Sequence, residues 1–455
     1  MRTKVHTLDM TKGPLAWPIL RFSIPLLCSN VLQVLFNMAD VAVVGRFAGA
    51  AALGSVGSTT MVVALFTGFM LGIGSGVNAL TARFLGAHRD EEVNQTVHTS
   101  CLVCLLIGLA AMGLCSGLAL PMLQLVDTKP ELLDGAVLYL QLYGLAMPAV
   151  ALYNFGSGVL NAAGDTRRPL YILLGAGFLN VCLNVFFVLA CGMDVDGVAI
   201  ASTISHYISA LLILVLLFRD REVYRMRLRD LRLNREKAVM LLKLGLPSGL
   251  HYSSFAVANL FMQVGINQFD TVMVEGNAAA VNTDSLIYDV TAAFCVACTS
   301  FVGQNFGAGE KKRMLKTYWI ALGYGLVAIG LVSAGLLLFG RPFLGLFTTE
   351  SAVVDAGLIR MRIMAASYLL CVPMDVSIAA CRGMGKSFWP MMFIFIGCCA
   401  LRIVWVFTVF AWVGTIGSLY LAYLASWIVT TTAVVVYFAG CFRRVDFTKQ
   451  DRLPA

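Results

Sequence analysis

The sequence predicts an all-α polytopic membrane protein, with 12 transmembrane helices in two parallel six-helix repeats. Three observations predict this fold: the composition is too apolar for a soluble protein, the apolar segments have the length of membrane helices, and the two halves of the chain share motifs. Of the 455 residues, 59% are hydrophobic and only 13% are charged, whereas soluble domains carry about 25% charged residues. The mean hydropathy of +0.82 therefore indicates that lipid surrounds most of the protein.

Each apolar segment is predicted to be a helix that crosses the membrane. A helix needs about 20 apolar residues to span the hydrocarbon layer, whereas a barrel strand would alternate polar and apolar residues over about 10 positions. A helix also satisfies its own backbone hydrogen bonds, which lipid requires. We expect the twelve helices at residues 15–44, 52–84, 95–120, 135–162, 170–191, 197–218, 240–268, 277–304, 316–340, 356–381, 390–412 and 416–440.

The connecting loops alternate in charge, which predicts the topology. Loops after even-numbered segments are basic, as at Arg167, Arg168 and residues 219–237, and those after odd-numbered segments are poorer in base; the loop after segment nine is mixed, with acids before Arg360 and Arg362. Basic loops stay in the cytoplasm. We therefore expect a multi-pass protein of a prokaryotic plasma (cytoplasmic) membrane, with both termini cytoplasmic and no cleavable signal peptide. The net charge of +8 resides in these loops and does not indicate a nucleic-acid partner.

The two halves of the chain repeat the same motifs in the same order. An even number of helices in each half gives both halves the same orientation in the membrane, an arrangement typical of transporters. We therefore expect an N-terminal lobe at residues 1–218, a basic cytoplasmic linker at 219–239 and a C-terminal lobe at 240–455. The corresponding positions are Pro25 and Pro247, Asn37 and Asn259, Gly86 and Gly307, Gly164 and Gly385, and Gly197 and Gly417.

Polar residues within the first half predict a functional site. Asp40 is an acid within the first apolar segment, and Asn37 and Gln33 share its helical face. An acid at membrane depth is costly and usually faces a bundle interior or a wet cavity. Asn180 and Asn184 lie one turn apart in the fifth segment. We expect these residues to converge, although the asparagines alone are equally compatible with hydrogen bonds that only hold helices together.

The second half has its own charged residues within apolar segments. Asp284 and Asp289 fall in the eighth segment, Asp375 in the tenth and Arg402 in the eleventh. Because Arg402 needs a counter-ion, a structural ion pair and a functional role are equally good explanations for one of these acids. Residues that could line a substrate cavity are Gln33, Phe36, Asn37, Tyr143, Asn154, His206, Asp289 and Asp375.

No pattern in the sequence indicates an enzyme, a cofactor or a metal site. The five histidines are dispersed, and the 13 cysteines lie mostly in apolar segments without paired metal-binding motifs. The string ACRGMGKS, which ends at Ser387, resembles a phosphate-binding loop. It lacks the first glycine and follows a membrane helix rather than a strand, so it does not predict nucleotide binding.

The chain resembles the multidrug and toxic compound extrusion (MATE) transporters along essentially its whole length. The resemblance includes LFNMADVAVVGRFAG, ARFLGAHRDEE, LNAAGDTRRP, FLNVCLNVFFV and FVGQNFGAGEKKR. It implies a V-shaped, two-lobe transporter, expected to be a monomer in lipid, that exchanges a proton or Na⁺ for amphipathic, often cationic compounds. It also implies a cation site at Asp40, with Asn180, Asn184 and Thr203. Some members carry a second acid where this chain has Asn184, and helix seven lacks the acid that another branch uses.

Within this framework, protonation of Asp40 would remove its charge and its attraction for a cationic substrate. The first helix would then repack by bending near Pro25, where a backbone hydrogen bond is missing. Two other classes of protein remain alternatives. A flippase for lipid-linked oligosaccharides has a related architecture but a more cationic cavity or added helices, and an intramembrane transferase would need a cluster of catalytic side chains.

Overall fold

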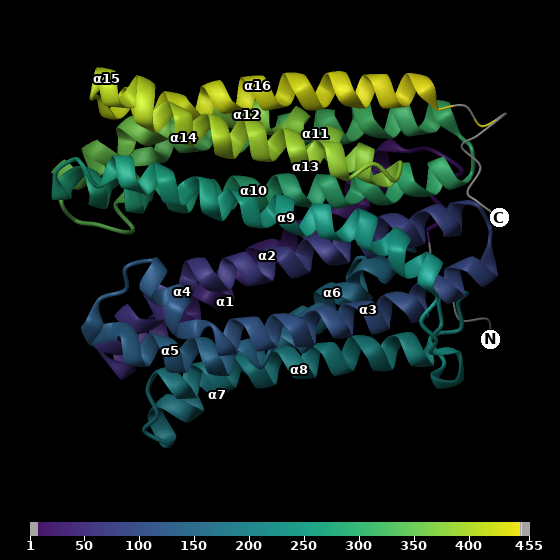
Figure 1. Ribbon diagram of the computed structural model, residues 1–455, viewed down its shortest axis with the longest axis horizontal. Coiled ribbons are helices and arrows are strands. Elements are labelled where there is room, and N and C mark those ends of the chain that lie inside the picture. The colour runs from purple at the N-terminus through teal and green to yellow at the C-terminus, as the bar shows by residue number, and fades with distance from the viewer. Residues whose placement is uncertain (1–7, 446, 448–455) are drawn as a thin grey trace. The chain divides into compact units, whose positions relative to one another are not determined.

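Helices make up every regular element in the part of the chain that the computed structural model describes (Figure 1). That part comprises residues 8–445 and 447, without the side chains of residues 37, 41, 50, 256, 257 and 260. Ten of its helices are long and apolar enough to cross a membrane, and α5 (Pro130–Gly144) with α6 (Met147–Ala162) forms another span bent by 45°. With α9 (Arg235–Ile266), whose 32 residues reach about 48 Å, the twelve expected helices are present.

The first six spans follow the expected order. Pro25 lies inside α1, which continues as a helix past it, and Gly49, with a φ of 92°, ends the following π-helical turn. A positive φ of this kind suits glycine because it has no Cβ. The elements besides α5 and α6 are α1 (Ala16–Val43), η1 (Val44–Ala48), α2 (Ala50–Gly86), α3 (Asp90–Gly117), the short α4 (Ala119–Leu125), α7 (Arg167–Val185), η2 (Phe186–Ala190) and α8 (Val195–Arg219).

The last six spans follow a linker that contains the 3₁₀ turn η3 (Leu228–Asp230). The Asp270 carboxylate accepts the Met273 N–H at 3.0 Å and caps the first of the helices after α9. Besides α9, the elements are α10 (Thr271–Gly307), α11 (Lys311–Leu344), α12 (Ser351–Gly383), α13 (Phe388–Ile394), η4 (Phe395–Ala400), α14 (Leu401–Trp405), η5 (Val406–Phe410), α15 (Ala411–Val413) and α16 (Ile416–Arg444).

The helices pack into two units. Described residues 8–10 and 24–253 belong to the first unit, and residues 11–23 and 254–445 to the second. The beginning of α1 thus packs with the second unit and the beginning of α9 with the first. The sequence repeat predicts lobe boundaries at residues 218 and 239. These boundaries stay a prediction, because they concern the repeat and the two units are defined by packing.

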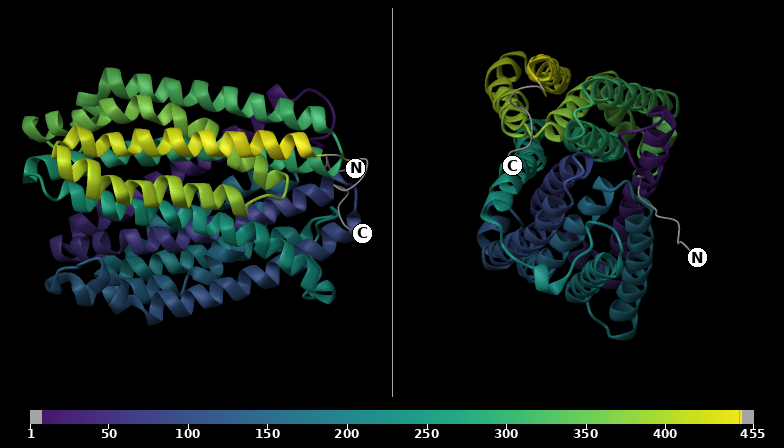
Figure 2. Two further views of the ribbon diagram at one scale, coloured as in Figure 1. Left: turned by 45° about the horizontal axis from the view of Figure 1, so that its top comes forward. Right: turned by 90° about the vertical axis from the view of Figure 1, so that its right-hand side faces the viewer.

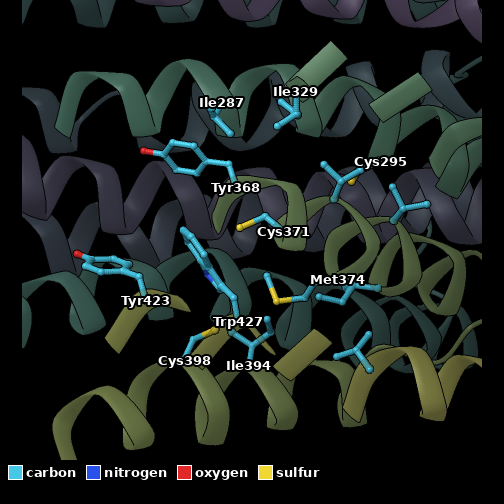
Figure 3. Packing of buried hydrophobic residues seen from close by; sticks show 14 of the residues in the cluster. Ile287, Cys295, Ile329, Tyr368, Cys371, Met374, Ile394, Cys398, Tyr423 and Trp427 are labelled. Atoms are coloured by element: carbon cyan, nitrogen blue, oxygen red, sulfur yellow. The ribbon is translucent and has the colours of Figure 1, made fainter. Parts of the chain in front are cut away.

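Within the first unit, α6 packs against both α2 and α3, and α7 lies beside α8 (Figure 1). Within the second unit, α12 packs against α10, α11 and α16. Both views in Figure 2 place α16 beside the segment from α13 to α15. Ile287, Met374 and Trp427 belong to the buried core between these helices (Figure 3).

Basic side chains tie the loops together at one end of the second unit. Arg313 donates hydrogen bonds to the carbonyl oxygens of Gly13 at 2.9 Å and Lys12 at 3.2 Å. The Lys311 ammonium donates to the Val445 carbonyl oxygen at 2.6 Å. The beginning of α11, the residues that precede α1 and the end of α16 therefore share one end of this unit.

A similar cluster joins two basic loops of the first unit. Arg168 forms ion pairs with Asp165 and, at 2.7 Å, with Asp220, and it donates to the Tyr224 hydroxyl at 3.1 Å. Burial first, and then the charge of Asp220, raise the pKa of the Tyr224 phenol above its ordinary value. The phenol stays protonated at neutral pH and donates to Asp220 at 3.3 Å. The loops that follow α6 and α8 are thus held at one end of the unit, as the alternation of loop charge predicts.

Candidate functional site

Asp40 joins a chain of polar side chains between α1, α7 and α8, all within the first unit. Asn184 Nδ2 donates a hydrogen bond to the Asp40 carboxylate and also lies 3.4 Å from Asn180 Oδ1. Asn180 Nδ2 in turn donates to Ser202 Oγ at 3.3 Å. Asn184 is fully buried and Asn180 nearly so, whereas Asp40 is half-buried. The structure therefore brings together the acid and both asparagines that the sequence indicates.

The chain of amides leaves oxygen acceptors available. Asn184 Oδ1 is buried and accepts no hydrogen bond among the described residues. Asp40 accepts only the bond from Asn184 among the side chains that the structure describes. Carboxylate and amide oxygens are suitable partners for a proton or a hard cation. Within the described residues, no three His, Cys, Asp or Glu side chains gather as a metal site.

Aromatic side chains lie close to the hydrogen-bonded side chains of Asp40, Asn184 and Asn180. Tyr143 on α5 stacks on Tyr139, with ring centroids 5.8 Å apart, and meets the edge of His206 on α8 at 5.9 Å. The Asp40 carboxylate is near enough to act electrostatically on both tyrosines. Tyr143 and His206, which the sequence assigns to a cavity, therefore lie in the same region of the first unit as Asp40.

Thr203 occupies a different place from the asparagines. Its hydroxyl donates to the Leu142 carbonyl oxygen of α5 at 3.0 Å. Thr203 therefore binds α8 to α5 and does not extend the Asp40 chain by a hydrogen bond. The backbone partner could not be foreseen from the sequence, because it depends on the rotation of α8 about its axis.

The remaining candidates of the first unit are spread along its helices. Phe36 is half-buried and packs on α7 at Gly177, where a Cβ atom would lie 1.9 Å from its ring. Gln33 is exposed. Asn154 donates to the Val150 carbonyl oxygen within α6 at 2.9 Å and lies where Gly74 of α2 approaches. The side chain of Asn37 lies outside the described residues.

The second unit holds the other candidate acids, Asp289 on α10 and Asp375 on α12, and both are half-buried. The sequence left open whether one of the acids forms a structural ion pair, and Asp284 does so, although not with Arg402. Asp284 pairs with Arg360 at 2.5 Å, and no carboxylate among the described residues lies within 4.0 Å of Arg402. Sequence reasoning missed this pair because it counted Arg360 with the charges of a loop.

Arg360 lies well inside α12, which begins at Ser351, and only 1% of it is exposed. Its guanidinium also donates to Asn277 Oδ1 at 2.8 Å. An available signal was that Arg360 falls within the predicted tenth segment, where a charged side chain needs a partner in the helix bundle.

Comparison with known proteins agrees with the repeat and the fold. The MatE family pattern matches residues 25–186 and again 247–408, so both matches begin at the paired prolines. The chain is 26% identical over 377 residues to the probable multidrug resistance protein YoeA of Bacillus subtilis, which covers 81% of each chain. It is 23% identical over 425 residues to the probable multidrug resistance protein NorM of Thermotoga maritima, which covers 88% of this chain and 89% of that protein.

The fold is similar to that of solved transporters. An outward-facing multidrug resistance MATE family transporter of the MOP superfamily superposes with a TM-score of 0.89 and 22% identity, over 97% of this chain and 99% of that one. The two family matches together cover well over half of the chain, and its helices follow the order of that fold. The chain therefore belongs to the MatE family, the multidrug and toxic compound extrusion transporters, and is an integral, multi-pass membrane protein.

Proposed function

We propose that the protein exports amphipathic, often cationic compounds in exchange for a proton or Na⁺ that binds at Asp40. The observation that carries this proposal is the hydrogen-bonded chain from Asp40 through Asn184 and Asn180 to Ser202. It connects α1 to α7 and α8, so a change in the charge of Asp40 changes the contact between helices.

The chemistry of these hydrogen-bonded side chains supports a cation as the coupling ion. The Asn184 amide donates to the carboxylate, a bond that is stronger when the carboxyl group is ionised. A proton or Na⁺ at Asp40 neutralises this charge and weakens that bond. The free Asn184 Oδ1 then supplies an acceptor for the incoming ion or its water. Ion and substrate need only favour different states of the transporter for their movements to be coupled.

The aromatic neighbours support the proposed substrate class. The faces of tyrosine rings attract cations, and the ionised Asp40 adds a negative charge near Tyr139 and Tyr143. A flat, cationic compound is therefore attracted to this region while Asp40 is ionised. Neutralisation of Asp40 removes that attraction, and the compound is released.

The loop geometry supports the proposed orientation in a prokaryotic plasma membrane, with both termini cytoplasmic. Arg313 and Lys311 bind the residues before α1 and after α16 at the end of the second unit that carries basic loops. Such loops are retained in the cytoplasm. Exposed apolar side chains such as Leu338, which is 77% exposed, are proposed to contact lipid around a monomer.

Dye transport in inverted vesicles tests the function. Vesicles are loaded with acid or with Na⁺ inside, in separate experiments, and uptake of ethidium is followed by fluorescence. We expect one of the two gradients to drive uptake, and Asp40→Asn to reduce the driven component at least tenfold. Asp194→Asn, which changes an exposed acid in a loop, is the matched control and should keep it. Undiminished exchange by Asp40→Asn would refute the role of Asp40, and no response to either gradient would refute antiport.

A further inference from the structure

Two arginines and two aromatic residues form a buried cluster in the second unit. Arg360 comes from α12, Arg402 from α14, and Tyr423 and Trp427 from α16. The Arg402 guanidinium carbon lies 4.3 Å from the centre of the Tyr423 ring, and that of Arg360 lies 5.2 Å from it. Neither arginine is more than 1% exposed. One tyrosine ring therefore contacts two buried cations.

The two arginines of this cluster differ in their ion pairs. Asp284 neutralises Arg360, with which it forms an ion pair at 2.5 Å, and it also accepts the Tyr368 hydroxyl. Arg402 has no such partner, since its Nε donates only to the Ser426 hydroxyl at 3.0 Å and no carboxylate of the described chain lies within 4.0 Å. A buried charge is normally paired, because burial removes its hydration. Within the described residues, the positive charge of Arg402 is therefore met by aromatic rings and a hydroxyl rather than by a carboxylate in direct contact.

The cluster is also rich in donors that have no protein acceptor. Nη1 and Nη2 of Arg402 and Nε1 of Trp427 are all buried, and none finds an acceptor among the described residues. The Arg402 guanidinium lies 5.5 Å from the centre of the Trp427 ring, so these donors belong to one small region. Figure 3 shows Trp427 with Tyr423 to its left and Cys398 below it, in the core of the second unit.

The helix that carries Arg402 is interrupted by π-helical segments on both sides of it. The π-helical segment η4 ends two residues before Arg402, and η5 begins four residues after it. Single π turns within α-helices are often found at functional sites.

We propose that Arg402 and Trp427 form a binding site for a small monovalent anion such as chloride. The site offers three buried N–H groups that lack an acceptor among the described residues, beside a guanidinium without a carboxylate in contact. An anion satisfies both the donors and the charge, whereas a water molecule satisfies only the donors. Because Arg402 and Trp427 are fully buried, a small ion suits the site better than a large organic anion. The bound anion would hold α14 to α16 by neutralising Arg402, a role separate from the acceptor-rich site at Asp40.

Thermal unfolding of the purified full-length protein tests this inference. The protein is dialysed into sodium gluconate, and gluconate is replaced stepwise by chloride or bromide at constant ionic strength. Unfolding is followed with a thiol-reactive fluorophore, since most of the cysteines that the structure describes are buried. We expect Tm to rise in a saturable manner, on the order of 5 °C once chloride reaches about one hundred times its Kd.

Substitutions locate the effect. Arg402→Gln should abolish the chloride-dependent shift, and Trp427→Phe, which removes one N–H but keeps an aromatic ring, should raise the half-saturating chloride concentration at least tenfold. Lys386→Gln, which removes an exposed cation of the same unit, should keep the wild-type response. If Arg402→Gln fails to fold, Trp427→Phe and the anomalous signal of bromide in crystals decide the question. Equal Tm in chloride and gluconate, an unchanged response of Trp427→Phe, or a water without bromide beside Arg402 would each overturn the proposal.

Discussion

The contact between Phe36 of α1 and Gly177 of α7 offers a direct test of how helix position controls the Asp40 site. A Cβ atom at residue 177 would lie 1.9, 2.2 and 2.3 Å from three atoms of the Phe36 ring. Nonbonded carbon atoms rest about 3.5–4.0 Å apart, so the ring must withdraw by roughly 1.5 Å. Phe36 lies one turn before Asp40, and Gly177 two turns before Asn184. Gly177→Ala therefore displaces the Phe36 ring, and we expect it to push α1 from α7 beside their polar contact.

The expected effect on transport is larger than the effect on stability. Overpacking of this kind destabilises the fold by about 1–3 kcal/mol. Loss of the Asn184–Asp40 hydrogen bond removes about 1.5–3 kcal/mol from the ionised state, which corresponds to roughly 10- to 150-fold in an equilibrium constant. We expect ion-driven dye uptake by Gly177→Ala in inverted vesicles to fall at least tenfold, while the protein still inserts and purifies as a folded species.

Two further variants make the interpretation specific. Gly175→Ala is the matched control, because a Cβ atom there meets nothing within 4 Å, and its uptake should equal that of the wild type. Phe36→Leu removes the ring that obstructs the new methyl group, so Phe36→Leu with Gly177→Ala should recover most of the activity of Phe36→Leu alone. The reasoning is refuted if Gly177→Ala transports as well as Gly175→Ala, or if the double variant shows no recovery.

Two other predictions concern ion pairs. Asp284→Asn leaves the Arg360 guanidinium buried without its carboxylate and should destabilise the protein by about 3–5 kcal/mol, which is measured as a lower melting temperature. The double variant Asp284→Leu with Arg360→Met should restore much of that lost stability. Equal stability of Asp284→Asn and the wild type would contradict a buried ion pair. Arg168→Leu breaks the ion pair with Asp220 and should destabilise the packing of the loops by about 1–3 kcal/mol. The loss is measured as faster trypsin cleavage within residues 219–239. Unchanged cleavage would show that the Arg168 cluster does not hold the linker.

Much of the Asp40 site could be predicted from the sequence because its members are exceptional within apolar segments. Asn180 and Asn184 are one turn apart on one helix, so their shared face follows from helix geometry alone. That Asn184 meets Asp40 depends on how closely α7 approaches α1, and a glycine at residue 177 permits that approach. The role of Thr203 was less predictable, since a hydroxyl can bond to any backbone carbonyl that the neighbouring helix presents.

The second unit shows the same limit for charged residues. The sequence indicates that Arg402 needs a partner, and Asp284 lies in a suitable segment, yet Asp284 pairs with Arg360. Which of two arginines an acid meets depends on the rotation and depth of three helices. Neither quantity is encoded in the spacing of residues along one helix.

The sequence by itself determined the helical fold, the repeat and the identity of the costly polar residues in the membrane. Transfer of side chains into lipid is a local free-energy term, so it can be summed along the chain. Only the tertiary structure decided which donors meet which acceptors, as in the bond from Asn184 to Asp40 and the Arg402 guanidinium, which contacts no carboxylate among the described residues. Hydrogen bonds and ion pairs act over a few ångströms between residues distant in sequence, and helix packing alone sets those distances.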